Sequence, residues 1–310
     1  MSEVKKQMWL PVIQDNLYAS KELLSQIATN DDVYVSQPQG MSWTVNIPQA
    51  GAVSGVTINP ESYPLPIEVR QDDILSYTLD NIVVKPIHLV KYQTDFLTYD
   101  AMASILRDHS GRLGEAQLYK SLINWYIGKQ TGKHVLTTGS TTETSAAAGS
   151  TAAAKVLTVK DFKDALKILD YQEIPDDGNR IAALTTQMFY QLLADLEAGN
   201  YNFTLVEKDG LVMLEKPLYN TKIVKFNRVV NTTNLGVARP YGHAGATTDI
   251  QASLIYHKDM VSWAEGGNLN VFVNEGDATM QGDVVSANAY LGAKYRRKDL
   301  KGVVPILQDV

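Results

Sequence analysis

The sequence predicts an α+β protein, in which helices and mostly antiparallel strands occupy different stretches of the chain. Three observations support this class. Apolar residues alternate with polar ones from about residue 33 to residue 79, as they do in strands. They recur at helical spacing over residues 98–127, and two long strand-like runs close the chain. With 310 residues, 45% hydrophobic and 20% charged, the chain is globular and long enough for one large or two modest cores.

The first part of the chain, between residues 8 and 30, predicts an extended segment followed by a short helix. Leu17, Leu23, Leu24 and Ile27 recur at helical spacing, and Ser20 is a suitable N-cap. We expect this arm to be small and to lead directly into the alternating region.

Residues 43–73, WTVNIPQAGAVSGVTINPESYPLPIEVRQDD, predict a long two-stranded ribbon. Its turn falls in NPESYP, and Pro64 and Pro66 are typical of an edge strand. The alternating apolar side chains are Trp43, Val45, Ile47, Val56, Ile58, Leu65, Ile67 and Val69. Such a ribbon is marginal by itself in water because it buries little apolar area. It must therefore pack on the body of its own chain or on a neighbouring copy, and the pattern favours neither strongly.

The strongest helix signal follows, from Thr98 to Ile127, with Thr98 or Asp100 as the N-cap. One apolar stripe contains Met102, Ile105, Leu106, His109, Leu113, Ala116, Leu122, Ile123 and Tyr126. Gly111 and Gly114 weaken the middle of this helix by about 1 kcal/mol each relative to Ala, which indicates a bend or close packing. We expect a long spine helix here.

The second half of the chain starts after a tract of small residues at 135–155, which we expect to be a surface loop or insertion. Thr158 caps a second helix, and RIAALTTQMFYQLLADLEAG, residues 180–199, predicts a third. Strand-like runs follow at 202–206, 211–215 and 222–230, and then a glycine-rich stretch. The chain ends as a strand, an acidic turn, a long strand and a short last strand.

Composition excludes several classes of function. There is no cysteine, so the chain has no disulfide, no thiolate metal site and no cysteine nucleophile. The net charge of −6 gives no overall basic footprint for nucleic acid. No apolar run approaches the roughly 20 residues of a membrane helix, and no export signal is evident.

Motifs for catalysis, cofactors or metals are absent from the sequence. GKQTGKH differs from a phosphate-binding loop in its glycine spacing and in having His134 in place of Ser or Thr. The five histidines, His88, His109, His134, His243 and His257, lack ligand spacing. An acidic turn with Glu275, Asp277 and Asp283 is a weak calcium candidate, and a solvated hairpin tip explains it better.

Two further clusters allow a functional and a structural interpretation. The basic residues Lys294, Arg296, Arg297, Lys298 and Lys301 suit contacts with phosphate or with a neighbour's carboxylates, but such a run is more often a solvated strand face. RPYGHAGATTD, residues 239–249, has the composition of an active-site loop, yet glycine-rich loops also occur where backbones crowd at a symmetry axis. Without a partner base, we rank an enzyme second.

The order of these parts, together with YLGAKYRRKDLKGVV and IPDDGNRIAALTTQMFYQLL, resembles the major capsid proteins of tailed bacteriophages, which share the Hong Kong 97-type capsid fold. The resemblance spans almost the whole chain, although its motifs are loose. It implies an N-terminal arm (1–39), an extended β loop with flanking strands (40–96), and a peripheral-domain spine helix with the small-residue loop (97–157). It further implies an axial domain (158–249), and peripheral return strands with a final axial strand (250–310).

The resemblance implies a structural protein that self-assembles into hexamers and pentamers of an icosahedral head around double-stranded DNA, with no catalytic residue, cofactor or metal. The extended loop would contact the adjacent subunit through Trp43, Val45, Ile47, Val56, Ile58, Tyr63, Leu65, Ile67 and Arg70. Arg239, Tyr241, Gly242 and Gly245 would form an axial loop near the capsomer centre. Lys294, Arg296, Arg297, Lys298 and Lys301 would contact other capsomers or DNA.

The partners implied are many copies of the chain, a separate scaffolding protein, portal and head-completion or decoration proteins, and packaged DNA held without base specificity. A separate scaffold is expected because only about forty residues precede the ribbon. The protein would assemble in the host bacterial cytoplasm, enter the virion capsid and need no membrane. Some family members join subunits through an extended-loop lysine, but no lysine lies between Lys21 and Lys85.

Three alternatives remain open at this point. A bacterial encapsulin shell has the same fold, and its particles would contain an enzyme instead of DNA. A glycan-binding or adhesive β module would use the tyrosines and stay monomeric. An enzyme with an unrecognised site would lose activity when His243 or Asp249 is replaced.

Overall fold

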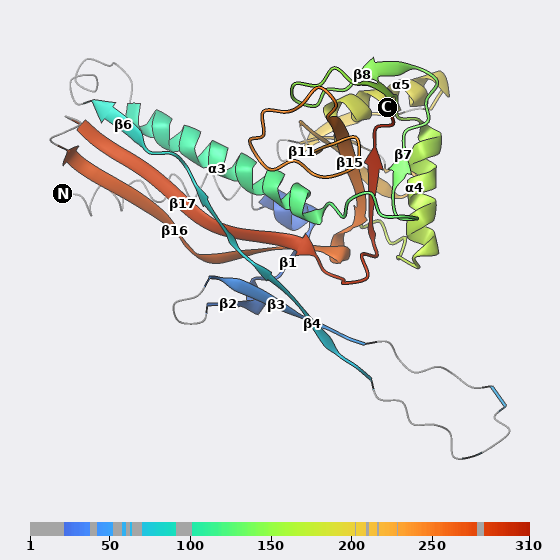
Figure 1. Cartoon of the computed structure of the whole chain (residues 1–310), viewed down its shortest axis with the longest axis horizontal. Coiled ribbons are helices and arrows are strands. Elements are labelled where there is room, and N and C mark those ends of the chain that lie inside the picture. Colours follow the sequence, from blue (N-terminus) through green and yellow to red (C-terminus); the bar gives the residue numbers. More distant parts are fainter. Residues whose placement is uncertain are drawn as a thin grey trace.

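The structure is a computed structural model that describes residues 22–37, 42–51, 58–59, 63, 70–90, 101–201, 203–208, 211–215, 217–227, 229–277 and 282–310. Figure 1 shows a body at one end, a long helix lying along a long β hairpin, and a narrow pair of strands, Thr44–Gln49 and Asp73–Thr78, below the hairpin. The described residues form helices together with sheets whose strand pairs are mostly antiparallel, which confirms the α+β class. Among the described residues, no helix combines the length and apolarity required to cross a bilayer.

An eight-stranded mixed sheet forms the body. Its main path runs β11-β12-β13-β10-β15-β18-β7, and β14 pairs with β15 outside this path. The strands are β7 (Val135–Leu136), β10 (Arg180–Thr185), β11 (Leu205–Lys208), β12 (Leu211–Leu214), β13 (Thr221–Phe226), β14 (Val230–Thr232), β15 (Ile250–His257) and β18 (Val303–Leu307). Every residue of β10, β15 and β18 is buried, so these strands form the centre of the body.

Two helices, α4 (Val159–Tyr171) and α5 (Thr186–Ala198), cover one face of this sheet. The sequence specifies the start of α4 locally. The Thr158 side chain accepts a hydrogen bond from the Asp161 amide, and the Asp161 carboxylate accepts one from the Thr158 amide, as in a capping box. The predicted capped helix is therefore confirmed. The opposite face of the sheet packs on the end of the spine helix and on residues 22–27, which form the predicted short helix.

The prediction of one helix over residues 180–199 was wrong for its first six residues. These form β10, which pairs in parallel with β13 and antiparallel with β15. The helix α5 begins only after Thr185, whose side chain accepts a hydrogen bond from the Met188 amide. Burial on both faces of a central strand outweighs the helix propensity of the Ala and Leu residues in this segment.

The prediction of a surface loop over residues 135–155 was also wrong. This tract contains β7, which pairs with β18, and a hairpin of β8 (Thr142–Thr144) with β9 (Ala153–Lys155). Thr137 and Ala154 are buried. The Ser145 hydroxyl donates to the Gln308 side chain at 2.6 Å, which ties the tract to the C-terminal residues. Small residues here allow close packing on the body.

A second sheet supports the long spine helix α3 (Ala101–Trp125), which lies along it in Figure 1. Its path is β1-β16-β17-β5, and β6 also pairs with β17. The strands are β1 (Thr29–Asn30), β5 (Asp80–Val83), β6 (Ile87–Val90), β16 (Val261–Asp277) and β17 (Gly282–Tyr295). Leu113, Leu122 and Trp125 of α3 are fully buried, and the Trp125 indole donates to the Ser262 carbonyl at 2.9 Å. The predicted helix and closing strand pair are both confirmed.

Two glycine substitutions are expected to change stability in opposite directions. Gly111 lies inside α3 with open space where a Cβ would be, so Gly111→Ala should raise the free energy of unfolding by about 0.5–1 kcal/mol. Gly245 has φ +89°, and a Cβ there would lie 1.7 Å from the Ala148 carbonyl oxygen. Gly245→Ala should therefore lower the free energy of unfolding. Urea unfolding of the unassembled chain measures both changes. A destabilised Gly111→Ala variant would contradict this account of the helix.

Candidate functional site

The ribbon starts in a three-stranded sheet of β2 (Val35–Ser36), β3 (Thr44–Gln49) and β4 (Asp73–Thr78). β3 and β4 pair antiparallel over their whole length, from Thr44 opposite Thr78 to Gln49 opposite Asp73. The predicted two-stranded ribbon is therefore confirmed at its base, meaning β3 and β4.

The apolar face of the ribbon base packs on the same chain. Val45 and Ile47 are buried, together with Leu75, Tyr77 and Leu79, against Ala264 of β16. Trp43 is half-buried in the same cluster. The expectation that Val45 and Ile47 contact an adjacent subunit was therefore wrong, because the second sheet of their own chain already covers these side chains, whereas for Trp43 it stays a prediction.

Two glycines make this close packing possible. Gly266 of β16 and Gly292 of β17 face the ribbon base, and a Cβ would lie 2.5 Å from Leu79 at Gly266 and 2.4 Å from Leu79 at Gly292. Only a residue without a side chain lets the two sheets approach to this distance. Neither glycine was predicted to have this role, since nothing near them in the sequence indicates which surface they face.

Polar contacts anchor the far edge of the ribbon base to the segment after β17. The Lys298 ammonium pairs with the Asp73 carboxylate, and the Gln49 side chain donates to the Arg296 carbonyl. The Lys298 amide donates back to Gln49 at 3.4 Å. Lys298 and the Ile74 amide hold the pKa of Asp73 below its usual value. These contacts fix where the ribbon leaves the body.

Arg296 also holds a buried carboxylate. Its guanidinium lies 3.2 Å from Asp31, whose residue surface is only 1% exposed. Burial raises the pKa of Asp31, and hydrogen bonds from Ser262 and Arg296 oppose that rise. The Asp31 amide also donates to the carbonyl of Trp263 in β16. The Asp31–Arg296 ion pair therefore connects the segment after β1 with β16 and with the end of β17.

The structure therefore changes the interpretation of the basic cluster. Arg296 and Lys298 are engaged within the chain, Arg297 pairs with Asp299 at 2.8 Å, and Lys294 donates to the Ser76 carbonyl at 3.4 Å. These four side chains therefore already have partners within the chain, and Arg297 and Lys298 remain about half exposed; contact of the cluster with DNA or another capsomer stays a prediction.

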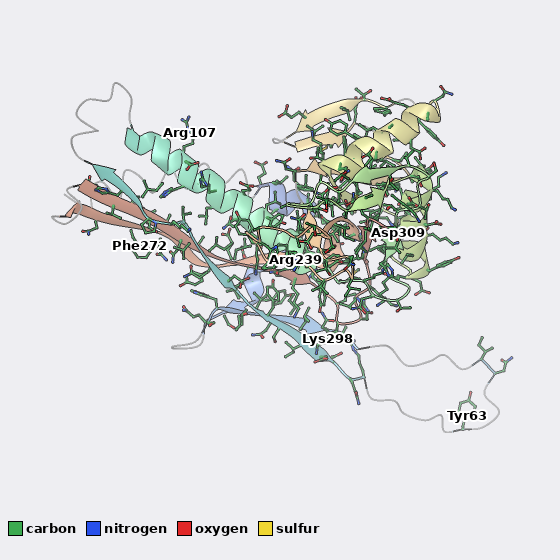
Figure 2. The ribbon with its side chains drawn as sticks, turned by 45° about the horizontal axis from the view of Figure 1, so that its top comes forward. Tyr63, Arg107, Arg239, Phe272, Lys298 and Asp309 are labelled. Carbon is green, nitrogen blue, oxygen red and sulfur yellow. The ribbon has the colours of Figure 1, made fainter. Side chains whose placement is uncertain are left out.

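The far end of the ribbon, which we call the ribbon end and define as Ile58, Asn59 and Tyr63, has the opposite character. Ile58 is 83% exposed and Tyr63 is 77% exposed. Figure 2 shows Tyr63 far from the body and at the opposite end of the molecule from Arg107 and Phe272. Arg70 is exposed and pairs with Asp72 at 2.6 Å. Val56, Leu65 and Ile67 lie outside the described residues.

A cleft of about 590 Å³ opens between α3 and the strands β5 and β6. Its apolar lining is Ile82, Val83, Val84, Ile87, Leu113 and Ala116. His109 also lines it and is fully buried, and neither ring nitrogen has a hydrogen-bond partner among the described residues. Burial lowers the pKa of His109, so its ring is neutral near pH 7. The cleft therefore combines an apolar lining with charged side chains, namely Asp80, Lys85, Asp108, Arg112 and Lys120.

The glycine-rich loop is held by one ion pair. Arg239 donates three hydrogen bonds of 2.6–3.1 Å to the carboxylate of Asp249, whose side chain is buried. Burial would raise the pKa of Asp249, but Arg239 and the Ala246 amide bring it below its usual value. Tyr241 contacts Tyr119 of α3 edge to face, with ring centroids 5.4 Å apart. Gly245 packs on Ala148, whereas Gly242 has φ +78° and open space around it.

These contacts hold the glycine-rich loop in one conformation. The five histidines do not gather into one group, and the described residues contain no cluster of metal-ligating side chains. Residues 278–281 of the acidic turn lie outside the described residues. The feature that stands out is the contrast between an anchored ribbon base and an exposed apolar ribbon end.

Comparison with known proteins gives a consistent result. The phage capsid protein family matches residues 95–310. The fold is similar to that of the capsid of Ralstonia phage GP4, with a TM-score of 0.59, 12% identity, and coverage of 92% of this chain and 87% of that chain. The capsid of cyanophage P-SCSP1u is similar as well, with a TM-score of 0.57, 14% identity, and coverage of 90% of this chain and 86% of that chain. The capsid of Helicobacter pylori bacteriophage KHP30 has a TM-score of 0.56, 13% identity, and coverage of 86% of this chain and 85% of that chain. No curated protein sequence matches significantly.

Proposed function

The chain belongs to the phage capsid protein family and is a structural protein of the phage head, and from this premise we propose that its copies associate head to tail through the ribbon. The ribbon end of one copy occupies the cleft beside α3 of the next copy. Repetition of this contact forms the hexamers and pentamers of an icosahedral shell around double-stranded DNA.

The observation that carries the proposal is the position of two complementary features on one chain. The ribbon end exposes Ile58 and Tyr63, and the cleft is lined by apolar side chains that include Val83 and Leu113. The cleft includes Asp108, the neighbour of Arg107, and Figure 2 shows Arg107 and Tyr63 at opposite ends of the molecule. A chain anchored as described cannot place its ribbon end in its own cleft. A contact between different surfaces of identical copies closes into rings.

The energetics suit an assembly with many contacts. Full burial of an apolar side chain of the size of Ile or Tyr contributes about 1.5–3 kcal/mol, so one ribbon end stabilises one contact only modestly. Each copy in a ring both gives and receives a ribbon end, and several linked contacts raise the overall affinity far above that of one. The neighbour's cleft would thus supply the apolar surface that the ribbon end lacks within its own chain.

The experiment that tests this function is the mass of the full chain in solution. Light scattering after size-exclusion chromatography, with electron microscopy of any heavy fraction, should show rings or closed shells, alone or after coexpression with the neighbouring genes. A strict monomer of 34.2 kDa under every condition would overturn the proposal. A monomeric binding module or an enzyme would then be the better explanation.

The two sheets support the proposed division into domains. We infer that the second sheet with α3 is the peripheral domain and that the eight-stranded sheet with α4 and α5 is the axial domain. The strand β7 pairs with β18, so residues 135–155 go with the axial domain instead of with the spine helix. Arg239, Tyr241, Gly242 and Gly245 then belong to a loop between α3 and the axial sheet.

Covalent joining through the ribbon is not expected. The chain has no lysine between Lys21 and Lys85, so the ribbon cannot supply the amine of an isopeptide bond. Assembled particles boiled in denaturant and separated by electrophoresis should therefore give monomers of 34.2 kDa. A ladder of covalent multimers would contradict this prediction.

The remaining partners follow from the same proposal. We infer a separate scaffolding protein, a portal with head-completion or decoration proteins, and packaged DNA that touches the shell without base specificity, all meeting in the host cytoplasm. Formation of uniform closed shells by the purified chain alone would count against the scaffold. The chain acts as a building block and has no catalytic role in this scheme.

A further inference from the structure

His109 of α3 is a buried polar side chain that makes no hydrogen bond to the described part of the chain. The residue is 0% exposed, and neither Nδ1 nor Nε2 has a partner among the described residues. A buried polar group is normally paired, because an unpaired one opposes folding. Positions where a chain keeps such an unfavourable group are often those that serve a function.

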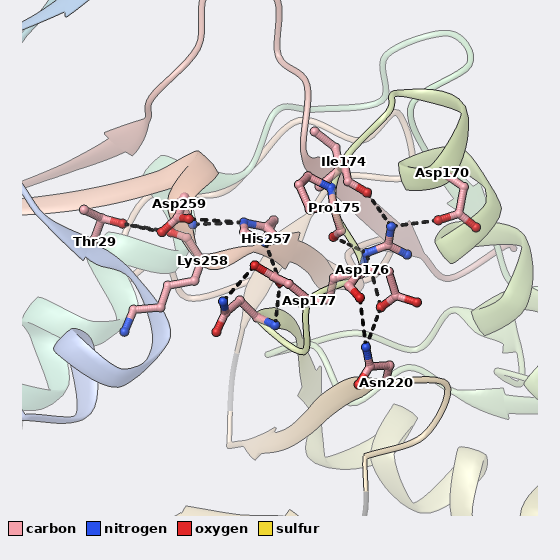
Figure 3. A network of polar contacts seen from close by, with 12 residues as sticks. Thr29, Asp170, Ile174, Pro175, Asp176, Asp177, Asn220, His257, Lys258 and Asp259 are labelled. Carbon is pink, nitrogen blue, oxygen red and sulfur yellow. Dashed lines mark hydrogen bonds and ion pairs between the residues drawn. The ribbon is translucent and has the colours of Figure 1, made fainter.

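His257, the last residue of β15, shows a buried histidine of the same chain with both nitrogens paired. It is 2% exposed, and Figure 3 shows its ring between Asp259 and Asp177. The Asp259 amide donates to Nδ1 at 3.2 Å, and Nε2 lies 3.0 Å from a carboxylate oxygen of Asp177. The two unpaired nitrogens of His109 are therefore not a general property of buried histidines in this fold.

His109 lines the cleft that receives the ribbon end in the proposed assembly. Two pairs of charged side chains in this cleft satisfy each other instead of His109. Asp108 pairs with Arg112 at 2.9 Å, and Asp80 pairs with Lys120 at 3.3 Å. Burial lowers the pKa of His109, so its ring is neutral and has one N–H donor and one acceptor nitrogen. The cleft thus offers an incoming group a hydrogen bond of either kind.

Tyr63 of the ribbon end carries a group that fits this site. It is 77% exposed, and its apolar ring ends in a hydroxyl that can both donate and accept. A tyrosine that enters an apolar cleft needs a partner for this hydroxyl, and either nitrogen of His109 can supply it. Ile58 has no polar group to offer. The Asn59 amide would bring two donors and an acceptor into the cleft, which is more than one imidazole satisfies.

We propose that His109 is the specificity-determining residue of the cleft and that it forms a hydrogen bond with the Tyr63 hydroxyl of a neighbouring copy. The assignment rests on the proposed function, and it adds to the apolar contact a polar one that selects a tyrosine in a single register. His109 is two residues from Arg107, and Figure 2 shows Arg107 and Tyr63 at opposite ends of the molecule. The bond therefore joins two copies.

Tyr63→Phe tests this bond on the full chain, because it removes one oxygen atom and keeps the apolar ring. Light scattering under conditions in which the unmodified chain forms particles measures the protein concentration needed for assembly. This concentration should rise by about tenfold, as expected for the loss of one hydrogen bond. Tyr171→Phe is the matched control, since Tyr171 is 76% exposed at the end of α4. It loses the same oxygen and should assemble at the unmodified concentration.

His109→Leu tests the other partner of the same bond. Leucine suits the apolar lining but leaves the Tyr63 hydroxyl unpaired, so this variant should also need about tenfold more protein for assembly. Adding Tyr63→Phe to it should bring no further loss, because both partners are then absent. Urea unfolding of the unassembled chain shows whether His109→Leu folds. If it does not fold, the comparison of Tyr63→Phe with Tyr171→Phe decides the question.

Three outcomes would overturn the proposal: assembly of Tyr63→Phe at the unmodified concentration, an equal loss in Tyr171→Phe, or additive losses when His109→Leu and Tyr63→Phe are combined. Failure of the proposed function looks different, because the chain would then assemble normally with both Ile58 and Tyr63 replaced by Ser. A chain that fails to assemble with both replacements but tolerates Tyr63→Phe would dock its ribbon end without His109 as a partner.

Discussion

Replacing Ile58 and Tyr63 together with Ser should prevent assembly while leaving the fold intact. Both side chains are exposed, so their removal costs the isolated chain almost nothing. In the proposed contact they are buried in a neighbour's cleft, and the loss of about 3 kcal/mol per contact raises the protein concentration needed for assembly by about 100-fold. Light scattering at a concentration where the unmodified chain forms particles should show monomers of the double variant.

Tyr171→Ser provides the matched control for this experiment. Tyr171 is 76% exposed, almost the same as Tyr63, but it lies at the end of α4 and away from both the ribbon and the cleft. This variant should assemble like the unmodified chain. Normal particles from the Ile58 and Tyr63 double variant would show that the ribbon end is not the contact, and equal losses from all variants would indicate a general solubility effect.

Arg296→Ala should be the most destabilising change in the basic cluster. It leaves the Asp31 carboxylate buried without a cation, which typically costs about 3 kcal/mol or more of folding free energy. The loss should be full at neutral pH. It should shrink as pH falls through the raised pKa of Asp31, because a protonated carboxyl group needs no cation. Urea unfolding of the unassembled chain at several pH values measures both effects.

Arg297→Ala is the control for Arg296→Ala, since the two residues are neighbours in the same basic run. Arg297 pairs with Asp299 at the surface, where such pairs contribute up to about 1 kcal/mol. We expect a small change that hardly varies with pH. Equal losses from the two variants would contradict the assignment of Arg296 as the partner of a buried carboxylate.

Local signals in the sequence predicted most of the secondary structure. The Thr158 cap, the helical spacing of buried residues such as Leu113 and Leu122 in α3, and the alternation in β3 all depend on residues within a few positions of one another. The helix prediction for residues 180–185 was wrong because the Ala and Leu residues of this segment continue the pattern of the helix that follows. Its burial between β13 and β15 comes from parts of the chain that are distant in sequence.

The candidate site was only partly predictable for the same reason. The exposed residues Ile58 and Tyr63 were among the expected contacts, but Val45 and Ile47 turned out to pack on their own chain. Alternation shows that a strand has an apolar face, and it does not show what covers that face. Arg296 similarly looked like part of a solvated basic run, because its partner Asp31 lies at the other end of the sequence.

The most direct test of the central claim is a cross-link between the ribbon end of one copy and the cleft of the next. The chain has no cysteine, so Tyr63→Cys and Val83→Cys introduce the only two thiols. Particles of the double variant treated with a short bis-maleimide should give a ladder of covalent multimers on denaturing electrophoresis, and either single variant alone should not. Normal particles of the double variant that yield only monomers would contradict the docking of the ribbon end in a neighbour's cleft.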